Sequence, residues 1–257
     1  MDEMKMLKNN TSGQVLILAA LAMALIISSA IIYAYQIRAA IRGENHSMLG
    51  YFVRNVKLES RNLVIGSLAN ISQGGSNETL RTNLQRWGSF LESHYYLGEC
   101  SFSFELCEDA PYSSGLRIFW GANGFGVSSA KVDCSLSLTD ENGEFNTGYS
   151  VNATSHIRVN ATSQQLLSQY QINVTIRVFN EGSPALCKNL TVYYKDKSGA
   201  WHDAGLLDSY VLQDYGNGTY VARFTVDPPR VANREIRVEC FDQREIYVEA
   251  KTTCVDI

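Results

Sequence analysis

The pattern of apolar and polar residues divides the chain into three regions, and the first is an apolar segment near the N-terminus. No charged residue occurs between Val15 and Ala34, and only two serines and a tyrosine interrupt the apolar run. A helix of ~20 residues rises ~30 Å and crosses the hydrocarbon core of a bilayer once. Backbone amides find no water in lipid, so such a segment has to be helical. The pattern predicts a transmembrane helix over residues 14–36.

Two other interpretations of this segment fit less well. A buried helix of a soluble domain normally has a polar face, which this segment lacks. A cleaved secretory signal has a shorter apolar stretch of ~7–15 residues, followed by a small-residue cleavage site.

Residues 37–98 have the three- and four-residue apolar spacing of amphipathic helices. Gly74 and Gly75 separate two such stretches, which predicts a helical hairpin that continues outside the membrane as a stalk. The apolar positions are Leu49, Phe52, Val53, Val56, Leu63, Val64 and Leu68 in the first stretch, and Leu80, Leu84, Trp87 and Leu91 in the second.

From Cys100 onward the apolar period changes to two, which is typical of β-strands. Residues 99–165 are expected to form a β-rich domain, in which the Asp140–Gly143 segment makes a hairpin turn rather than a calcium loop. In residues 166–257 short alternating stretches are separated by turn residues about every ten positions, which favours a β-sandwich. The predicted fold class is therefore α+β, with antiparallel β domains distal to the membrane.

One hairpin gives the sandwich a family resemblance. The segment from Leu212 to Val226 contains Tyr215-Gly-Asn-Gly-Thr-Tyr220. It resembles the Gly-x-Gly-Thr-Tyr hairpin of filamin-like and bacterial immunoglobulin-like repeats. The resemblance implies an Ig-like β-sandwich over residues 166–257 and implies little about function.

The N-terminal junction resembles a second family. Residues 1–13 form a polar leader with Lys5 and Lys8, and Gly13-Gln14 stands directly before the apolar run. This order is similar to the class III signal of archaeal type IV pilin-like proteins and to TadE/TadG-like pseudopilins. The resemblance implies that a prepilin peptidase cuts between Gly13 and Gln14 and that the helix is retained. The chain departs from bacterial pilins in having Leu18 where they carry an acidic residue, and an uncut signal anchor is the alternative.

Composition narrows the possible partners and cofactors. The formal net charge is −4, and no basic run occurs, which argues against nucleic acid as a partner. No Cys-x-x-Cys pair and no histidine at zinc-ligand spacing is present, so we expect no metal site and no cofactor. The sequence lacks Gly-x-Ser-x-Gly and His-Glu-x-x-His motifs, and we expect no enzyme.

Six cysteines follow the apolar segment, and an even number suggests disulfides in an oxidising compartment. Cys100 and Cys107 are too far apart if they belong to one strand. Cys100 and Cys134 share the core-facing phase, so we expect this pair. Among the fifteen connectivities we then expect Cys187–Cys240, which would staple the two sheets of the sandwich, and Cys107–Cys254, which is left over and would tie the two β units together.

Eight Asn-x-Ser/Thr sequons also follow the segment, and the strand phase places those of the β region on polar faces, where a glycan can be carried. The same placement is expected of any polar residue. The sequons are at Asn45, Asn70, Asn77, Asn152, Asn160, Asn173, Asn189 and Asn217.

Cysteines and sequons together predict a single-pass protein in the cell membrane whose C-terminal part is extracellular. The flanking charges favour the opposite orientation, since Arg38, Arg42, Arg54 and Lys57 follow the apolar segment. A large C-terminal domain is exported despite a few such charges.

The combined pattern predicts a pilin-like, membrane-anchored structural or adhesion protein, as a component of a pilus or pseudopilus. Its expected partners are the membrane, further copies or other pilin-like subunits, and a prepilin peptidase. The alternative is a membrane-anchored extracellular binding subunit that does not polymerise.

Overall fold

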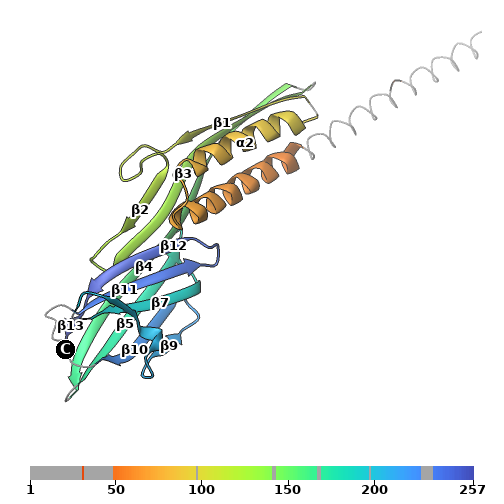
Figure 1. Ribbon diagram of the computed structural model, residues 1–257. Coiled ribbons are helices and arrows are strands. Elements are labelled where there is room, and N and C mark those ends of the chain that lie inside the picture. The colour runs from red at the N-terminus through yellow and green to blue at the C-terminus, as the bar shows by residue number, and fades with distance from the viewer. Residues whose placement is uncertain are drawn as a thin grey trace, which may run out of the picture. The chain divides into compact units, whose positions relative to one another are not determined.

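The computed structural model (Figure 1) describes Ile31 and residues 49–257, apart from residues 97, 141–142, 167–168, 197 and 227–233. Its contacts divide the chain into two units, residues 1–56 and residues 57–257. The leader and nearly all of the predicted transmembrane segment lie outside the described residues. Ile31 is helical and exposed. Among the residues described, no helix combines the length and apolar character needed to cross a membrane.

Two helices precede the strands in the described part of the chain. Residues 49–72 are helical, and α2 spans Thr79–His94. Both bury apolar side chains at three- and four-residue steps, as amphipathic helices on a sheet do. The buried positions include Val64, Leu68 and Ile71 in the first helix and Leu80, Leu84 and Leu91 in α2.

Two glycines form the turn between these helices. Gly74 has a φ of +95°, a conformation that favours glycine. A Cβ atom on Gly75 would lie 2.0 Å from Oδ1 of Asn70. The chain therefore reverses here on a positive φ at Gly74 and on a lack of space for a side chain at Gly75.

A nine-stranded sheet forms the body of the second unit, and its main strand order is β1-β3-β4-β5-β10-β9. The short strands β2 and β6 pair with β3 and β5, and β13 runs parallel to β4. The strands are β1 (Glu99–Leu106), β2 (Leu116–Trp120), β3 (Phe125–Asp140), β4 (Gly143–Leu166), β5 (Gln169–Asn180), β6 (Ser183–Pro184), β9 (Val211–Asp214), β10 (Thr219–Val226) and β13 (Val255–Asp256).

A four-stranded sheet with the order β12-β11-β7-β8 faces part of the large sheet. It consists of β7 (Cys187–Lys195), β8 (Trp201–Asp203), β11 (Glu235–Asp242) and β12 (Tyr247–Thr253), with the short 3-10 helix Ala204–Leu206 after β8. The core between the two sheets is made of alternate strand residues such as Ile157, Ile176 and Phe224 on one side and Val238 and Val248 on the other.

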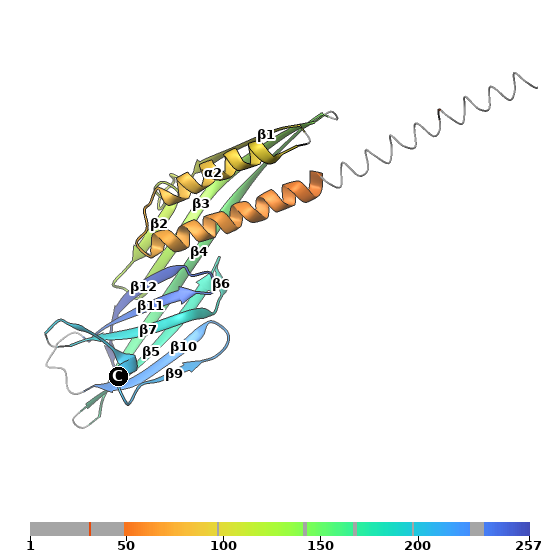
Figure 2. The ribbon, with the colours of Figure 1, turned by 45° about the vertical axis from the view of Figure 1, so that its right-hand side comes forward.

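Strand β4 links the two parts of the unit. It is 24 residues long, well beyond the ~3–10 residues of most strands. Its odd-numbered residues share one face. Near its start Tyr149 accepts or donates a hydrogen bond of 2.9 Å with Ser60 of the first helix, and further along Ile157 is buried under the small sheet. The helices and the small sheet therefore cover successive lengths of the same face, as Figure 2 shows.

The predicted α+β fold class is wrong. The structure is predominantly β and sandwich-like, and the sheet runs without a break past the expected boundary at residues 165–166, where β4 turns into β5. The physical reason is that inward-facing and outward-facing residues alternate along one strand from residue 149 to residue 163, close to that boundary. An apolar period of two identifies a strand, but it does not show that one strand packs under both the helices and the small sheet.

Gly126 provides a test of how closely the two sheets approach. It lies on β3, and a Cβ atom built on it would be 1.9 Å from the carbonyl oxygen of Glu249 on β12. We expect Gly126→Ala to lower the free energy of unfolding by ~1–3 kcal/mol, because β12 must move away. The matched control is Gly148→Ala on β4, where the nearest atom is 3.9 Å away. Chemical denaturation compares the two, and equal stability of both variants would contradict this packing.

Candidate functional site

The sequence-predicted glycosylation positions are mostly accessible. The predicted processing residues Gly13 and Gln14 and the sequon residue Asn45 lie outside the described residues. Asn173 is half-buried. The other sequon asparagines are exposed: Asn70, Asn77, Asn152, Asn160, Asn189 and Asn217.

Two of the sequons are neighbours in the sheet. Asn160 of β4 pairs with Thr175 of β5, and Thr162 pairs with Asn173. Each asparagine therefore lies opposite the threonine of the other sequon. Four amide and hydroxyl groups gather on the face of the sheet that is turned away from the helices.

The structure separates two of the three expected cysteine pairs. Cys100 pairs with Leu138 on β3, whereas Cys134 lies opposite Phe104. The four-residue offset corresponds to ~13 Å, too far for a disulfide. The backbone amide of Cys107 donates to the carbonyl oxygen of Lys131, which pairs with Asn152 of β4. Cys254 directly precedes Val255, which pairs with Thr162 of β4. Cys107 and Cys254 are therefore separated by the length of β4 from Asn152 to Thr162.

The third pair is in contact. The Sγ atoms of Cys187 and Cys240 are 2.6 Å apart as free thiols. The hydrogen bond with Cys187, followed by burial, raises the pKa of Cys240. Both residues belong to the small sheet, on the neighbouring strands β7 and β11. The expectation that this pair joins the two sheets is therefore wrong.

A highly connected polar group among the described residues was missed by sequence reasoning. It centres on Asp242, whose side chain is fully buried in the turn between β11 and β12. Its Oδ1 accepts hydrogen bonds from the backbone amides of Arg244 and Ile246, at 2.8 and 3.0 Å. Its Oδ2 accepts from Nε of Arg244 at 2.9 Å. A buried carboxylate needs such partners because its desolvation is otherwise unfavourable.

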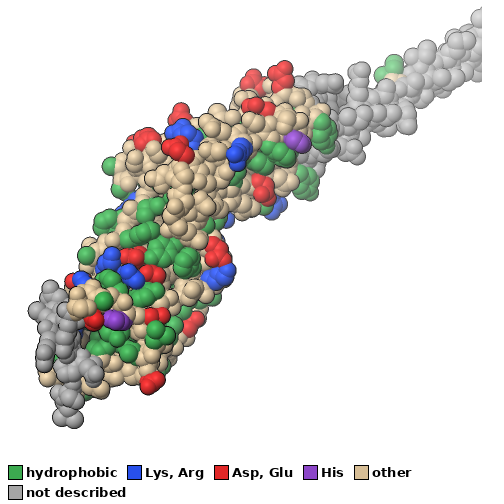
Figure 3. Space-filling view, in the orientation of Figure 1, with side chains coloured by type: hydrophobic (Ala, Val, Ile, Leu, Met, Phe, Trp, Pro, Cys, Tyr) green, Lys and Arg blue, Asp and Glu red, His purple; other side chains and the backbone are tan. Residues whose placement is uncertain are grey.

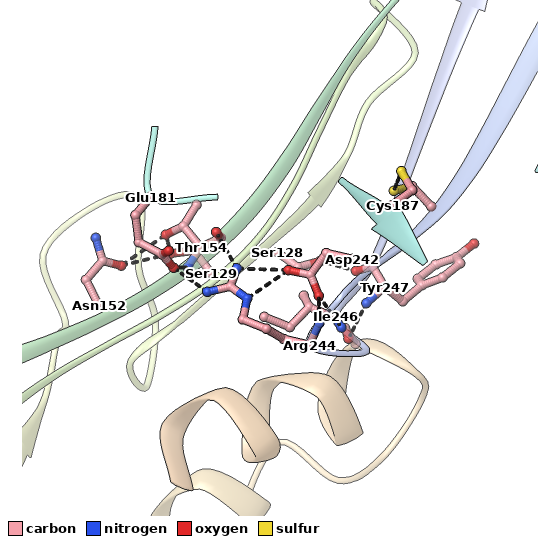
Figure 4. Close-up of polar contacts among 12 residues, drawn as sticks. Ser128, Ser129, Asn152, Thr154, Glu181, Cys187, Asp242, Arg244, Ile246 and Tyr247 are labelled. Atoms are coloured by element: carbon pink, nitrogen blue, oxygen red, sulfur yellow. Dashed lines mark hydrogen bonds and ion pairs between the residues drawn. The ribbon is translucent and has the colours of Figure 1, made fainter. Parts of the chain in front are cut away.

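Arg244 connects this turn with the large sheet (Figure 4). Its Nη1 donates to Oε1 of Glu181 at 2.6 Å, and its Nη2 donates to the carbonyl oxygen of Thr154 at 3.0 Å. Burial alone would lower the pKa of Arg244, but the bond to Glu181 and the nearby Asp242 outweigh it and raise that pKa. Glu181 also accepts from the amide of Thr154. We call Asp242, Arg244, Glu181 and Thr154 the clamp.

The end of the first helix is attached beside the clamp. Ser72 Oγ accepts the backbone amide of Tyr247 at 3.0 Å, and Nε2 of Gln73 donates to the carbonyl oxygen of Glu245 at 2.8 Å. Ser128 of β3 donates to the carbonyl oxygen of Tyr247 at 2.6 Å. The helix, the long strands and the small sheet therefore meet at one turn, which is a structural arrangement rather than a reactive one.

A serine, an aspartate and a histidine also meet at the β7–β8 turn. Asp196 accepts from Ser198 Oγ at 2.7 Å and lies 2.8 Å from Nε2 of His202. The bond from Ser198, then that from His202, lowers the pKa of Asp196. In a catalytic triad the histidine lies between serine and aspartate. Here Asp196 lies between Ser198 and His202, so the histidine is not placed to act as a base for the serine. The group stabilises a turn.

No group of three metal-ligating side chains occurs among the residues described. A cleft of about 580 Å³ opens near the ends of the two facing sheets, where Tyr194, Lys195, Glu235 and Thr225 are among its lining residues. Lys195 and Glu235 neutralise each other across 2.9 Å. Neither Lys195 nor Glu235 therefore offers an unpaired charge to a ligand in the cleft.

Aromatic rings line up across four strands on the face opposite the helices. Phe125 of β3 has ring-centroid distances of 6.5 Å to Phe119 and 5.8 Å to His156, and His156 stacks on Phe179 at 4.8 Å. Burial, then Arg158 and Arg117, lower the pKa of His156. We call these four rings the aromatic row. Its members come from β2 to β5, so only the pairing register could reveal it.

The cysteine geometry predicts one disulfide in the native protein, between Cys187 and Cys240. Of the six cysteines, four should then react with an alkylating reagent in denaturant without reductant, and all should react after reduction. Mass spectrometry of the labelled peptides measures this. Burial is the main factor that raises the pKa of Cys134 and of Cys254 to about 11, so these two thiols should label slowly before denaturation. Cys187→Ser is the control and should give five reactive thiols. Six without reduction in the wild-type protein would contradict the pairing.

Comparison with known proteins adds no family to this description. No protein-family model matches the chain, and no curated protein is significantly similar to it.

Proposed function

We propose that the protein is a pilin-like, membrane-anchored subunit of a cell-surface structure, with structural or adhesive function. The observation that carries this proposal is the order of residues at the N-terminus. Gly13-Gln14 precedes the uncharged segment instead of following it. Cleavage at this point would retain the apolar helix, which would anchor the subunit or enter a filament core.

The second unit is suited to being the exposed head of such a subunit. Its first helix lies with one apolar face on an antiparallel sheet, and residues on its other side, such as Glu59, Arg61 and Asn62, are exposed. The rigid β framework would then display its strand faces to the surroundings.

Assembly would need a driving force other than the hydrophobic effect. Lipid is as apolar as leucine, so an apolar helix gains little by leaving it. Small residues allow helix backbones to approach closely and to gain van der Waals contacts. The segment offers alanines for this purpose at positions 19, 20, 22, 24 and 30.

The extracellular orientation is supported by two features of the head. Four exposed sequon asparagines are on strands or in turns away from the Asn160–Asn173 pair, where glycans would not disturb the core: Asn77, Asn152, Asn189 and Asn217. Cys187 and Cys240 lie where oxidation would join them, and disulfides persist in oxidising compartments. No arrangement of a nucleophile with a base supports an enzymatic role in the described residues, and the proposal includes none.

The mature N-terminus tests this function. The full-length chain is produced in a host with a prepilin peptidase, and the N-terminus of the surface protein is sequenced. We expect it to begin at Gln14 and expect the protein in sheared surface filaments. Gly13→Val should block cleavage, whereas the control Ser12→Ala should not.

Three outcomes would contradict the proposal in different ways. An N-terminus at Met1 would indicate an uncut anchor. An N-terminus beyond Tyr35 would indicate an ordinary secretory signal. A chain that begins at Gln14 but is absent from sheared filaments would be the binding subunit that does not polymerise.

A further inference from the structure

Part of the large sheet's outer face, turned away from the helices and the small sheet, is basic: the part formed by residues 145–166 of β4 together with β5 and β10. Even-numbered residues of β4 and odd-numbered residues of β5 and β10 point to this side, because their neighbours in sequence are buried in the core. Arg158, Arg177 and Arg223 are exposed there. The segment from residue 145 to residue 166, β5 and β10 contain no aspartate or glutamate. The protein has a net charge of −4, so this face differs in sign from the chain as a whole.

Two of these arginines are direct neighbours across strands. Arg158 pairs with Arg177 in the β4–β5 register. Like charges placed opposite each other destabilise a sheet. In the described part of the chain neither arginine has an ion-pair partner, and the nearby Glu181 is bonded to Arg244. The sheet therefore holds two adjacent cations without the anion that would relieve their repulsion.

On the opposite side of the molecule, basic side chains are not separated from acidic ones. Figure 3 shows acidic and basic side chains interspersed over the face that carries the helices and the small sheet. Most ion pairs of the described residues lie on or beside those elements, for example Lys195–Glu235 and Arg237–Glu239. The uncompensated charge is thus a property of one face.

The aromatic row lies next to the arginine pair. His156 precedes Arg158 by two residues on β4, and Phe179 follows Arg177 by two on β5, so each ring is the next outward side chain along its strand. Phe119, at the end of the row, is 49% exposed. Ring faces and edges of this kind offer apolar contact beside the charges.

Neutral hydrogen-bonding groups occupy the rows on the other side of the arginine pair. Asn160 lies opposite Thr175, and Thr162 lies opposite Asn173. Amides and hydroxyls both donate and accept hydrogen bonds. Apolar rings, adjacent arginines and neutral polar groups therefore follow one another across this face.

We propose that this face binds an acidic polysaccharide. The guanidinium groups of Arg158 and Arg177 would pair with carboxylates of the chain, since arginine binds carboxylates in a planar, bidentate manner. The aromatic row would contact the apolar faces of sugar rings, and the asparagines and threonines would bond to hydroxyls. The inference deepens the adhesive part of the proposed function and rests on it for the biological setting alone, since binding requires neither the anchor nor assembly.

A nucleic acid is the competing ligand, because single strands also bind to basic faces with aromatic residues. The described face favours the polysaccharide. Its charge is confined to a few arginines on an acidic protein, whereas nucleic-acid affinity grows with the number of phosphates neutralised. The paired amide and hydroxyl groups fit a ligand rich in hydroxyls.

Binding of defined polymers to the full-length protein in detergent tests the proposal. The protein is produced without N-glycosylation, since glycans at Asn160 or Asn173 would cover the face. The probes are polygalacturonate, neutral dextran and oligodeoxythymidylate. We expect polygalacturonate to bind most tightly, with an affinity that falls as salt is added.

Matched variants locate the binding. Arg158→Gln/Arg177→Gln should weaken polygalacturonate binding by about tenfold or more, because charge-assisted bonds are lost. The control Arg81→Gln/Arg86→Gln removes the same charge from α2 and should leave binding unchanged. Phe119→Ser should weaken binding without a change of charge. Thermal unfolding checks the fold, and the Arg158/Arg177 variant should be at least as stable as wild type because repulsion is removed.

Each contrary result has a distinct meaning. Equal binding of dextran, or equal weakening by the α2 control, would overturn the role of the arginine pair. Tighter binding of oligodeoxythymidylate that is lost in the Arg158/Arg177 variant would overturn the polysaccharide in favour of nucleic acid. A mature N-terminus other than Gln14 would refute the pilin-like function and leave the binding result standing.

Discussion

The buried carboxylate of Asp242 is the constraint on which the arrangement of the second unit depends. A charge removed from water needs several hydrogen bonds, and the amides of its own turn and the guanidinium of Arg244 supply them. Arg244 in turn needs the oxygens of Glu181 and Thr154. Satisfying one buried charge thereby fixes the small sheet against the middle of β4, beside the end of the first helix.

This arrangement gives the large sheet two different sides. The helices and the small sheet cover one face over successive lengths of β3 and β4, and their apolar residues form a continuous core. The other face of β4, β5 and β10 is occupied by arginines, asparagines and threonines. This face does not pack against the helices or the small sheet, so its side chains can be used for recognition. The rigid backbone of the sheet holds them in rows.

The local sequence pattern predicted much of the secondary structure. Alternation indicated strands from Cys100 onward, because a half-buried strand must alternate, and Gly74-Gly75 marked the helix reversal. Register was beyond reach: Cys100 and Cys134 share a buried-side phase, yet they are four residues out of alignment. Phase repeats every two residues and so cannot distinguish registers that differ by two or four residues. The clamp and the aromatic row depend on residues far apart in the chain, so no short motif indicated them.

The clamp fixes the turn that also holds Ser72 and Gln73 at the end of the first helix, so we expect the helical part and the sandwich to unfold together. Variants that retain only Trp87, on α2, or only Trp201, on β8, report on the two parts separately during denaturation. With Arg244 in place, both tryptophans should show the same midpoint. In Arg244→Met, which leaves the buried Asp242 without its charged partner at an expected loss of ~3–5 kcal/mol, the two midpoints should fall and separate. Separate transitions with Arg244 intact, or unchanged coincident transitions in Arg244→Met, would contradict the claim.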